Sequence, residues 1–161
     1  MQTHAVEPQA ILGLLQQTET AVLATHRSDG TINARFMFFA CDEQLKRFYL
    51  MTLGTTEKLT ELARDAGATL STLFLPAGGK VDKAAETIVT GRVVISQDFS
   101  IDWVQQGATL LGKKFPALAG FAASGSLGEY HLIRLDSAQL VFQTYENAMR
   151  TGAKTVLSFP S

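Results

Sequence analysis

Hydrophobic and polar positions alternate along this 161-residue chain in two different periods. The helical period, with apolar residues three or four positions apart, is clearest where Ile11, Leu14 and Leu15 would share one face. Near the middle of the chain, Asp98 or Ser100 is expected as the N-cap of another helix, because short polar side chains accept hydrogen bonds from the first turn. The segments predicted as helices are 7–18, 58–66 and 98–111.

The strand period appears in a series of short segments that are rich in β-branched and aromatic residues and separated by polar turns. The first turn contains Asp29-Gly30, a pair that favours a tight hairpin because glycine tolerates positive φ angles. Gly91 interrupts a later strand and indicates a bulge or a tight bend. The glycine-rich segments 76–80 and 125–128 are expected to be loops, and the tail after residue 147 shows no period. The predicted strands are 20–26, 32–41, 45–52, 69–75, 87–96, 129–135 and 139–145.

Many short strands with tight turns and few helices predict a mainly β protein, a closed or half-closed barrel with α-helices. A length of 161 residues suits one domain, residues 1–161, with one core. The segment 36–41 is apolar at nearly every position, so both faces of this strand are expected to be buried. A small barrel covers only one face, and we expect a helix or the second subunit of a homodimer to cover the other.

Charge and composition exclude several classes of protein. Fourteen basic and fifteen acidic residues give a net charge of −1, whereas binding to nucleic acid or to an anionic membrane normally needs an excess of Lys and Arg. The longest apolar run is too short to cross a bilayer, and residues 1–8 lack the pattern of a signal peptide. A single cysteine, Cys41, favours a reducing cytoplasm. The three histidines are scattered without metal-ligand spacing, so no metal site is expected.

One stretch of the sequence carries candidate binding chemistry. Arg35 lies on one predicted strand, Thr52 ends the next, and Thr55, Thr56 and Lys58 stand at the start of the following helix. A helix N-terminus attracts anions through unpaired N–H groups and a partial positive charge. The arginine can add a two-pronged contact and the lysine a point charge. This order of residues favours a site for a phosphate attached to a flat, apolar ring.

An alternative interpretation of the same residues needs no ligand. Arg35 would then pair with Asp29 or Glu57 at the surface, where an ion pair contributes little stability. Lys58 would be a solvated helix residue, and the two threonines before the helix are expected as caps whether or not an anion binds. A phosphate explains the positions of both cations at once, which favours binding.

Several motifs occur together between residues 20 and 70: the Asp29-Gly30 turn, Arg35 followed by Met37, Thr52 at a strand end, and Thr56-Glu57-Lys58 before a helix. In this order and spacing they resemble the pyridoxamine 5′-phosphate oxidase-like, FMN-binding split-barrel family. The resemblance extends more loosely to residue 135. It implies a six-stranded antiparallel split β-barrel of Greek-key type that forms a homodimer, with FMN held in grooves at the subunit interface.

The resemblance also implies roles for individual residues. Arg35, Thr56 and Lys58 would bind the FMN phosphate, and Thr55 lies in the same loop before the helix. No catalytic residue is implied, because the chemistry would belong to the flavin and the protein would supply orientation and electrostatics.

The flavin ring would meet backbone groups of Phe36 and Met37 at its polar edge, with Thr52 beside the ring or the ribityl chain. True pyridoxamine-phosphate oxidases also carry a C-terminal Arg and His that handle the substrate, and a Gln-Ser pair that completes the flavin site. Here no histidine follows His131, and residues 103–106 do not form that pair. Oxidation of vitamin B6 is therefore not expected.

The leading hypothesis from the sequence is a cytoplasmic, homodimeric flavoprotein, an FMN-dependent oxidoreductase that acts on an unidentified small molecule. Three alternatives stay open on the same barrel. The chain could bind a deazaflavin, although near-neutral charge gives no support for a long acidic tail. It could bind haem through a histidine such as His26 or His131, or it could be a non-catalytic dimer.

Overall fold

The computed structural model describes residues 5–160. Residues 1–4, which belong to the segment expected not to be a signal peptide, and residue 161 lie outside the described part. In chain order the helices and strands are α1 (Pro8–Gln17), β1 (Thr20–His26), β2 (Ile32–Phe38), β3 (Ala40–Cys41), β4 (Arg47–Leu53), α2 (Glu57–Arg64), β5 (Gly67–Phe74), β6 (Ala85–Ser96), α3 (Asp102–Lys114), α4 (Ala119–Ser124), β7 (Tyr130–Thr144), α5 (Tyr145–Arg150) and β8 (Thr155–Ser158). None of the helices in residues 5–160 is long and apolar enough to cross a bilayer.

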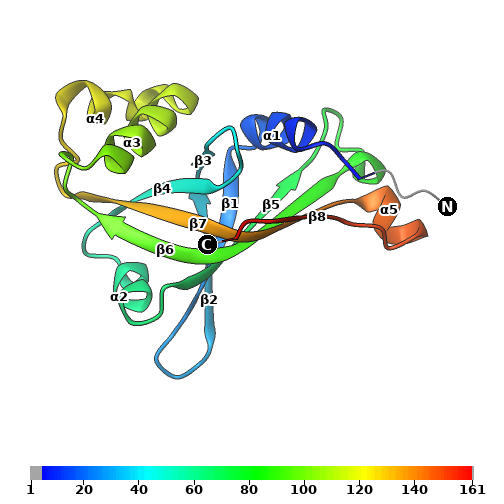
Figure 1. Cartoon of the computed structure of the whole chain (residues 1–161), viewed down its shortest axis with the longest axis horizontal. Coiled ribbons are helices and arrows are strands. Elements are labelled where there is room, and N and C mark those ends of the chain that lie inside the picture. Colours follow the sequence, from blue (N-terminus) through cyan, green and yellow to red (C-terminus); the bar gives the residue numbers. More distant parts are fainter. Residues whose placement is uncertain (1–4, 161) are drawn as a thin grey trace.

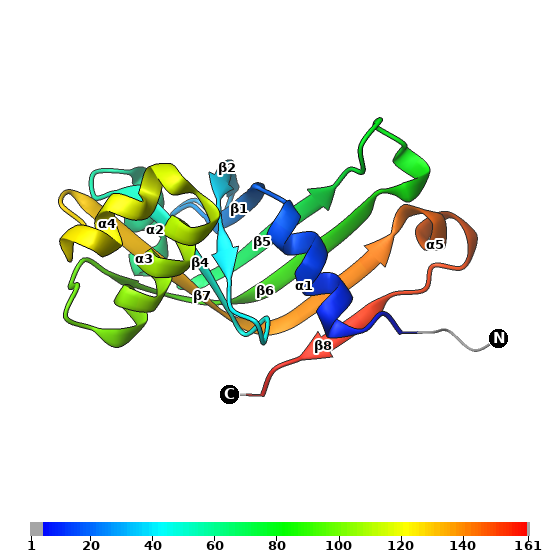
Figure 2. The same cartoon turned by 90° about the horizontal axis from the view of Figure 1, so that it is seen from above.

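The strands form one antiparallel sheet in the order β2-β1-β5-β6-β7-β4-β3, and β8 pairs with β7 beside this path. The sheet curls so that β2 approaches β4. The result is the half-barrel seen in Figures 1 and 2, with α1 lying across the sheet and α3 and α4 at one end. The predicted split-barrel fold with helices is thus confirmed, although the sheet has eight strands rather than six.

The core positions the helices on the curled sheet. Ile11 and Leu15 of α1 are fully buried, as predicted, whereas the third buried apolar residue of this helix is Leu12 and Leu14 is only half-buried. These side chains belong to the larger cluster of buried residues inside the sheet, while a smaller cluster packs α3 against β4 and β7. Apolar burial on this scale is the main favourable contribution to folding.

The predicted helices at 7–18, 58–66 and 98–111 correspond to α1, α2 and α3, with shifted ends. The cap expected for α3 is wrong, because this helix begins only at Asp102 and Ile101 occupies its N-cap position. Asp98 and Ser100 instead form a turn of their own. The Asp98 carboxylate accepts hydrogen bonds from the backbone N–H and the hydroxyl of Ser100, at 3.0 and 2.7 Å.

The segment 129–145 contains one strand, β7 (Tyr130–Thr144), and not the two strands predicted from the sequence. The residues between the two predicted strands, 136–138, are accommodated by a bulge opposite Gly91, where the register with β6 shifts. A Cβ atom at Gly91 would lie 2.0 Å from the carbonyl oxygen of Asp136, so only glycine permits this approach. The first half of β7 pairs with β4 and the second half with β8, which extends the sheet along one edge.

The predicted strand 32–41 is divided into β2 and β3 around Phe39, which is fully buried. The expectation that both faces of 36–41 are buried fails for the single chain, because Phe36 is 80% exposed and Phe38 56% exposed. Met37, between them, points into the core. Outward-facing aromatic side chains on a strand at the edge of the sheet are unusual for a monomer.

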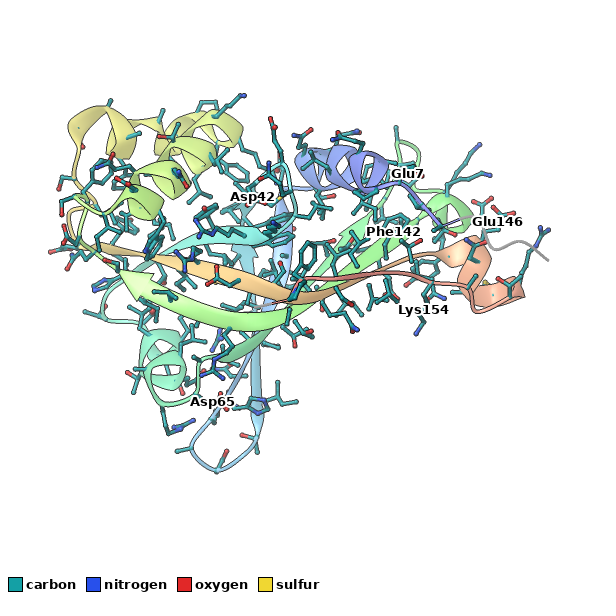
Figure 3. The ribbon with its side chains drawn as sticks, viewed as in Figure 1. Glu7, Asp42, Asp65, Phe142, Glu146 and Lys154 are labelled. Carbon is teal, nitrogen blue, oxygen red and sulfur yellow. The ribbon has the colours of Figure 1, made fainter. Side chains whose placement is uncertain are left out.

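The tail after residue 147 is ordered, although no sequence period predicted it. The hydroxyl of Thr144 accepts a hydrogen bond from the backbone N–H of Asn147 at 3.1 Å and so caps α5. The strand β8 then returns along β7, where Thr155 pairs with Phe142. Figure 3 shows that Phe142, Glu146 and Lys154 all lie at this end of the sheet, away from the α3–α4 end.

Lys114, near the end of α3, joins this helix to α1. Its Nζ donates a hydrogen bond to the carbonyl oxygen of Leu15 at 3.0 Å and lies 3.8 Å from the centre of the Phe39 ring. A cation is favourable at the C-terminus of a helix and over an aromatic face. Burial nevertheless lowers the pKa of Lys114 from 10.5 to about 8, against the smaller opposing influence of Cys41 and Glu19.

We predict that the wild-type protein gains stability relative to Lys114→Met as the pH rises from about 8 to 10.5. In this interval the unfolded chain keeps a proton that the folded protein has released, so folding becomes more favourable, by at most about 1.4 kcal/mol per pH unit. Urea unfolding of both proteins at several pH values in this range measures the difference. Lys113→Met, at the exposed neighbouring position, is the control. A difference that stays constant with pH would contradict the prediction.

Candidate anion-binding site

The site predicted from the sequence lies where the inner face of β2 meets α2. Side chains of β2 alternate, so that Asn33, Arg35 and Met37 point inward while Phe36 points outward. Met37, near the C-terminal end of β2, belongs to the apolar core. Toward the N-terminal end of the strand, at Arg35 and Asn33, the inner face is polar. Thr25 of β1 lies directly opposite Asn33 and is also buried. The helix α2 covers this polar end of the barrel.

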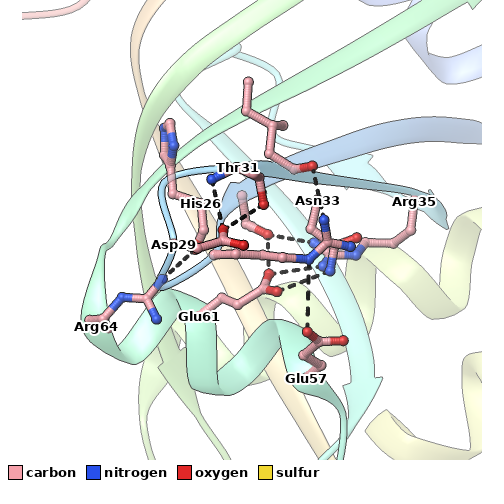
Figure 4. A network of polar contacts seen from close by, with 11 residues as sticks. His26, Asp29, Thr31, Asn33, Arg35, Glu57, Glu61 and Arg64 are labelled. Carbon is pink, nitrogen blue, oxygen red and sulfur yellow. Dashed lines mark hydrogen bonds and ion pairs between the residues drawn. The ribbon is translucent and has the colours of Figure 1, made fainter.

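The carboxylate of Glu61, on α2, lies at the centre of the polar end. It accepts hydrogen bonds from the Thr25 hydroxyl, from the Asn33 amide at 3.0 Å and from Arg35 Nη2 at 3.0 Å. Arg35 Nη1 also donates to the Thr25 hydroxyl oxygen at 2.7 Å. Figure 4 shows Asn33 and Arg35 of β2 converging on Glu61 of α2. Since Glu61 is only 4% exposed, this is a buried ion pair in which the carboxylate is well satisfied.

Hydrogen bonds keep Glu61 negatively charged despite its burial. Burial alone would raise the pKa of this carboxyl, but the hydrogen bonds from Thr25, Asn33 and Arg35 and the charge of Arg35 outweigh it. They lower the pKa from 4.5 to about 2. Glu61 therefore remains an anion at any physiological pH.

The two surface ion pairs considered for Arg35 are both wrong. Asp29 accepts hydrogen bonds from the backbone and the hydroxyl of Thr31 within the hairpin turn. Glu57 lies 4.0 Å from Arg27 and is well exposed. Arg35 pairs instead with a buried carboxylate, and its own side chain is 19% exposed.

Lys58 and two threonines form a second group of polar contacts beside the first. Lys58 Nζ donates to the Thr52 hydroxyl oxygen at 2.8 Å, and the hydroxyl oxygens of Thr52 and Thr56 are 3.2 Å apart. Thr56 occupies the N-cap position of α2, as expected, but its hydroxyl donates to the Leu53 carbonyl at 3.0 Å. Within the described residues it therefore makes no capping hydrogen bond to the first turn.

The two predicted cations lie on the same side of the barrel. Burial is the main cause that lowers the pKa of Lys58, the positive charge of Arg35 lowers it further, and Glu61 raises it. Lys58 and Glu61 are three residues apart on α2 and so share one side of this helix. The structure thus brings together Arg35, Thr52, Thr56 and Lys58 of the seven predicted cofactor-binding residues.

The other three predicted residues do not reach this cluster with their side chains. Phe36 points outward, Met37 is in the core, and Thr55 is exposed in the connection between β4 and α2. Their expected contacts with a flavin, two of them through backbone groups, stay predictions.

Sequence analysis considered His131 only as a possible haem ligand and did not predict its place opposite Thr52 in the pairing of β7 with β4. Directly opposite residues point to the same face of a sheet, so His131 and Thr52 share a side. The imidazole packs against Gly54, where a Cβ atom would lie 2.6 Å from the ring. Its Nδ1 is buried without a hydrogen-bond partner among the described residues. The order Thr52-Leu53-Gly54 was the available signal, because a glycine at a strand end often permits a close approach.

No family model and no curated protein matches this sequence. Solved structures do match its fold. A heme binding protein from Mycobacterium smegmatis aligns with 98% of this chain at 13% identity and a TM-score of 0.75, and the chain spans only 60% of that protein. HutZ, a heme storage protein from Vibrio cholerae, aligns with 85% of this chain and 94% of its own at 16% identity, with a TM-score of 0.67.

A third solved structure, from Clostridium acetobutylicum, is related to general stress protein 26 of Bacillus subtilis and is assigned to the pyridoxinephosphate oxidase family. It aligns with 96% of this chain and 97% of its own at 14% identity, with a TM-score of 0.64. At these identities the likeness concerns the fold. This chain has the split-barrel fold of the pyridoxamine 5′-phosphate oxidase-like proteins.

We predict that Glu61 contributes stability that is lost in acid. The unfolded chain takes up a proton near pH 4.5 and the folded protein only near pH 2, so the advantage of the wild type over Glu61→Gln shrinks across this window. At neutral pH the substitution should cost about 1.5–3 kcal/mol, the usual range for hydrogen bonds to a charged group. Urea unfolding at several pH values measures this. The exposed Glu57→Gln should show little change, and an equal acid response of both variants would refute the assignment.

Proposed function

We propose that this chain is an FMN-binding flavoprotein, a homodimer that holds FMN at the subunit interface and transfers hydride or electrons to an unidentified small molecule. The observation that supports the proposal is the position of Arg35 and Lys58. These two cations lie on one side of the barrel, with the hydroxyls of Thr52 and Thr56 beside them at the start of α2.

Lys58 and Arg35 both have donors to offer a phosphate. An ammonium group has three N–H donors, and Lys58 uses one of them on Thr52 within the described residues. A guanidinium has five donors, and Arg35 directs one bond to Thr25 and one to Glu61. The helix start adds backbone N–H groups and a favourable dipole for an anion. These groups would hold the FMN phosphate by charge-assisted hydrogen bonds.

Bound FMN would supply the redox chemistry through its isoalloxazine ring. The chain's own residues would anchor the phosphate, orient the ribityl chain through Thr52, and present the backbone of Phe36 and Met37 to the ring.

The outward face of β2 supports the proposed homodimer. Phe36 and Phe38 are largely exposed there, and Ile32 on the same face is 63% exposed. A second copy of the chain could cover these side chains and exclude water from a ring that lies beside them.

Haem is a second candidate ligand, because two of the similar structures are named as heme proteins. A histidine that ligates iron through Nε2 usually donates a hydrogen bond from Nδ1 to an acceptor. Nδ1 of His131 is buried without such an acceptor among the described residues, so we favour FMN. A Soret band on addition of haem that disappears in His26→Ala or His131→Ala would reverse this order.

We predict that purified protein is yellow, and that Arg35→Ala and Lys58→Ala each weaken FMN binding by at least ~10-fold, which corresponds to about 1.4 kcal/mol. Each change removes charged donors from the phosphate, and the arginine change also leaves Glu61 without its partner. Fluorescence titration of apoprotein measures the affinity. Arg27→Ala, an exposed cation in the hairpin turn, is the control.

Two outcomes would contradict this assignment. Unchanged FMN affinity in both variants would exclude the proposed phosphate site. Colourless protein with no saturable FMN titration would favour the non-catalytic dimer, and mass spectrometry of any ligand released on denaturation separates FMN from a deazaflavin.

We predict that Phe36→Ser converts a dimer into monomers without unfolding the chain. Phe36 is 80% exposed in the single chain, so its loss should not disturb the core but should remove an aromatic anchor from the subunit contact. Sedimentation velocity measures the assembly state. Met149→Ser provides the matched control, because Met149 is 86% exposed but lies on α5. A wild-type monomer, or an unchanged dimer in Phe36→Ser, would refute the assigned interface.

A further inference from the structure

The polar end of the barrel contains one negative and two positive side chains in close proximity. Arg35 and Lys58 supply the positive charges and Glu61 the negative one. At the rim, Arg27 and Glu57 lie 4.0 Å apart and largely cancel each other. The remaining groups of the cluster are hydroxyls and an amide. The site therefore offers an incoming anion a net charge close to +1.

Glu61 is fixed in this position. Its carboxylate accepts hydrogen bonds from three side chains on two strands, and its side chain is only 5% exposed. Moving it aside would leave the buried hydroxyl of Thr25 and the half-buried amide of Asn33 without this acceptor, which is costly. An anion that binds Arg35 must therefore share the guanidinium with Glu61 and must approach a second negative charge at short range.

We infer that Glu61 sets the charge preference of this site, so that the advantage of a doubly charged phosphate group over a singly charged one is smaller than the two cations alone would give. A phosphodiester, or a monoester that retains one proton, is then accepted nearly as well as a dianionic monoester. A phosphate monoester such as that of FMN is largely doubly charged at neutral pH, because its second proton leaves near pH ~6. Each additional negative charge on the ligand meets the repulsion of Glu61. This inference rests on the proposed binding of a flavin phosphate.

Three flavins separate charge from shape in the test. FMN carries the doubly charged monoester, riboflavin 4′,5′-cyclic phosphate carries a singly charged diester, and riboflavin has no phosphate. Their affinities are measured by fluorescence titration on wild-type protein, Glu61→Gln and Glu57→Gln. The last variant removes the same charge one helical turn away, from an exposed side chain.

We expect Glu61→Gln to bind FMN at least ~10-fold more tightly than the wild type, because one like charge beside the phosphate is removed. The cyclic phosphate should gain clearly less, and riboflavin should bind unchanged. Glu57→Gln should alter the ratio of FMN to cyclic-phosphate affinity by less than ~3-fold, since exposed charges are screened. An unchanged or lower ratio in Glu61→Gln would overturn the inference.

A measurement on the wild type keeps the test decisive if Glu61→Gln does not fold. Between pH ~7.5 and ~5.5 the phosphate of FMN takes up a proton, whereas the cyclic diester does not. In the wild type the affinity for FMN relative to the diester should therefore change by less than ~3-fold as the pH falls, because Glu61 offsets one of the two cations. Other groups that face the site, Lys58 and Glu57 of α2 and His131 of β7, act more strongly on a doubly charged ligand than on a singly charged one, so the titration is repeated on His131→Gln, where the same small change is expected. A fall of ~10-fold or more in the ratio would refute the role of Glu61.

The two proposals fail in different ways. If none of the three flavins binds the wild type or any variant, the proposed flavin function is wrong. If FMN binds the wild type in a manner that depends on Lys58, but the ratio ignores Glu61, the function stands and the charge preference is refuted.

Discussion

The buried carboxylate of Glu61 is the interaction on which the polar end of the barrel depends. Desolvating a carboxylate is costly, and the cost is offset here because donors from β1 and β2 converge on it. The same hydrogen bonds fix α2 against the hairpin, so the position of Lys58, one helical turn earlier, follows from that of Glu61. The positions of Arg35 and Lys58 thus depend on Glu61. Any phosphate ligand would approach a site in which Glu61 already balances part of the positive charge.

The sequence predicted the cations of this site and missed the anion between them. Leu59, Leu62 and Ala63 recur at helical spacing, which predicts that they share the buried side of α2. In the structure the buried side is rotated toward Glu61, and Ala63 is exposed. An amphipathic pattern assigns apolar residues to the buried side of a helix and a glutamate to the solvent side, because unpaired charges are rarely buried. Its partners Thr25 and Asn33 are distant in sequence, and only the hairpin register brings them together. Such a network depends on tertiary contacts that no local pattern reports.

The strands illustrate the same division between local and tertiary causes. The segment 20–26 was predicted with the bounds that β1 has, since its composition and the following Asp-Gly turn are local signals. The unbroken course of β7 was not predicted, because Asp136-Ser137 resembles a turn in isolation. A bulge opposite Gly91 absorbs these residues, and it exists only when β6 is already alongside. The first half of β7 then holds β4 in register, which places Thr52 beside His131.

The strand β2 would connect the proposed ligand binding to the proposed dimer, because its two faces carry different side chains. Arg35 points inward to the candidate anion site, while Phe36 and Phe38, which follow it on the opposite face of the strand, point outward and are exposed. Under the proposed dimer, covering the outward face would immobilise the strand that carries the guanidinium. A ligand that binds only the assembled form must then stabilise the assembly by the same free energy with which assembly favours the ligand. Cofactor occupancy and dimerisation of this chain would accordingly rise and fall together, whichever anion the site prefers.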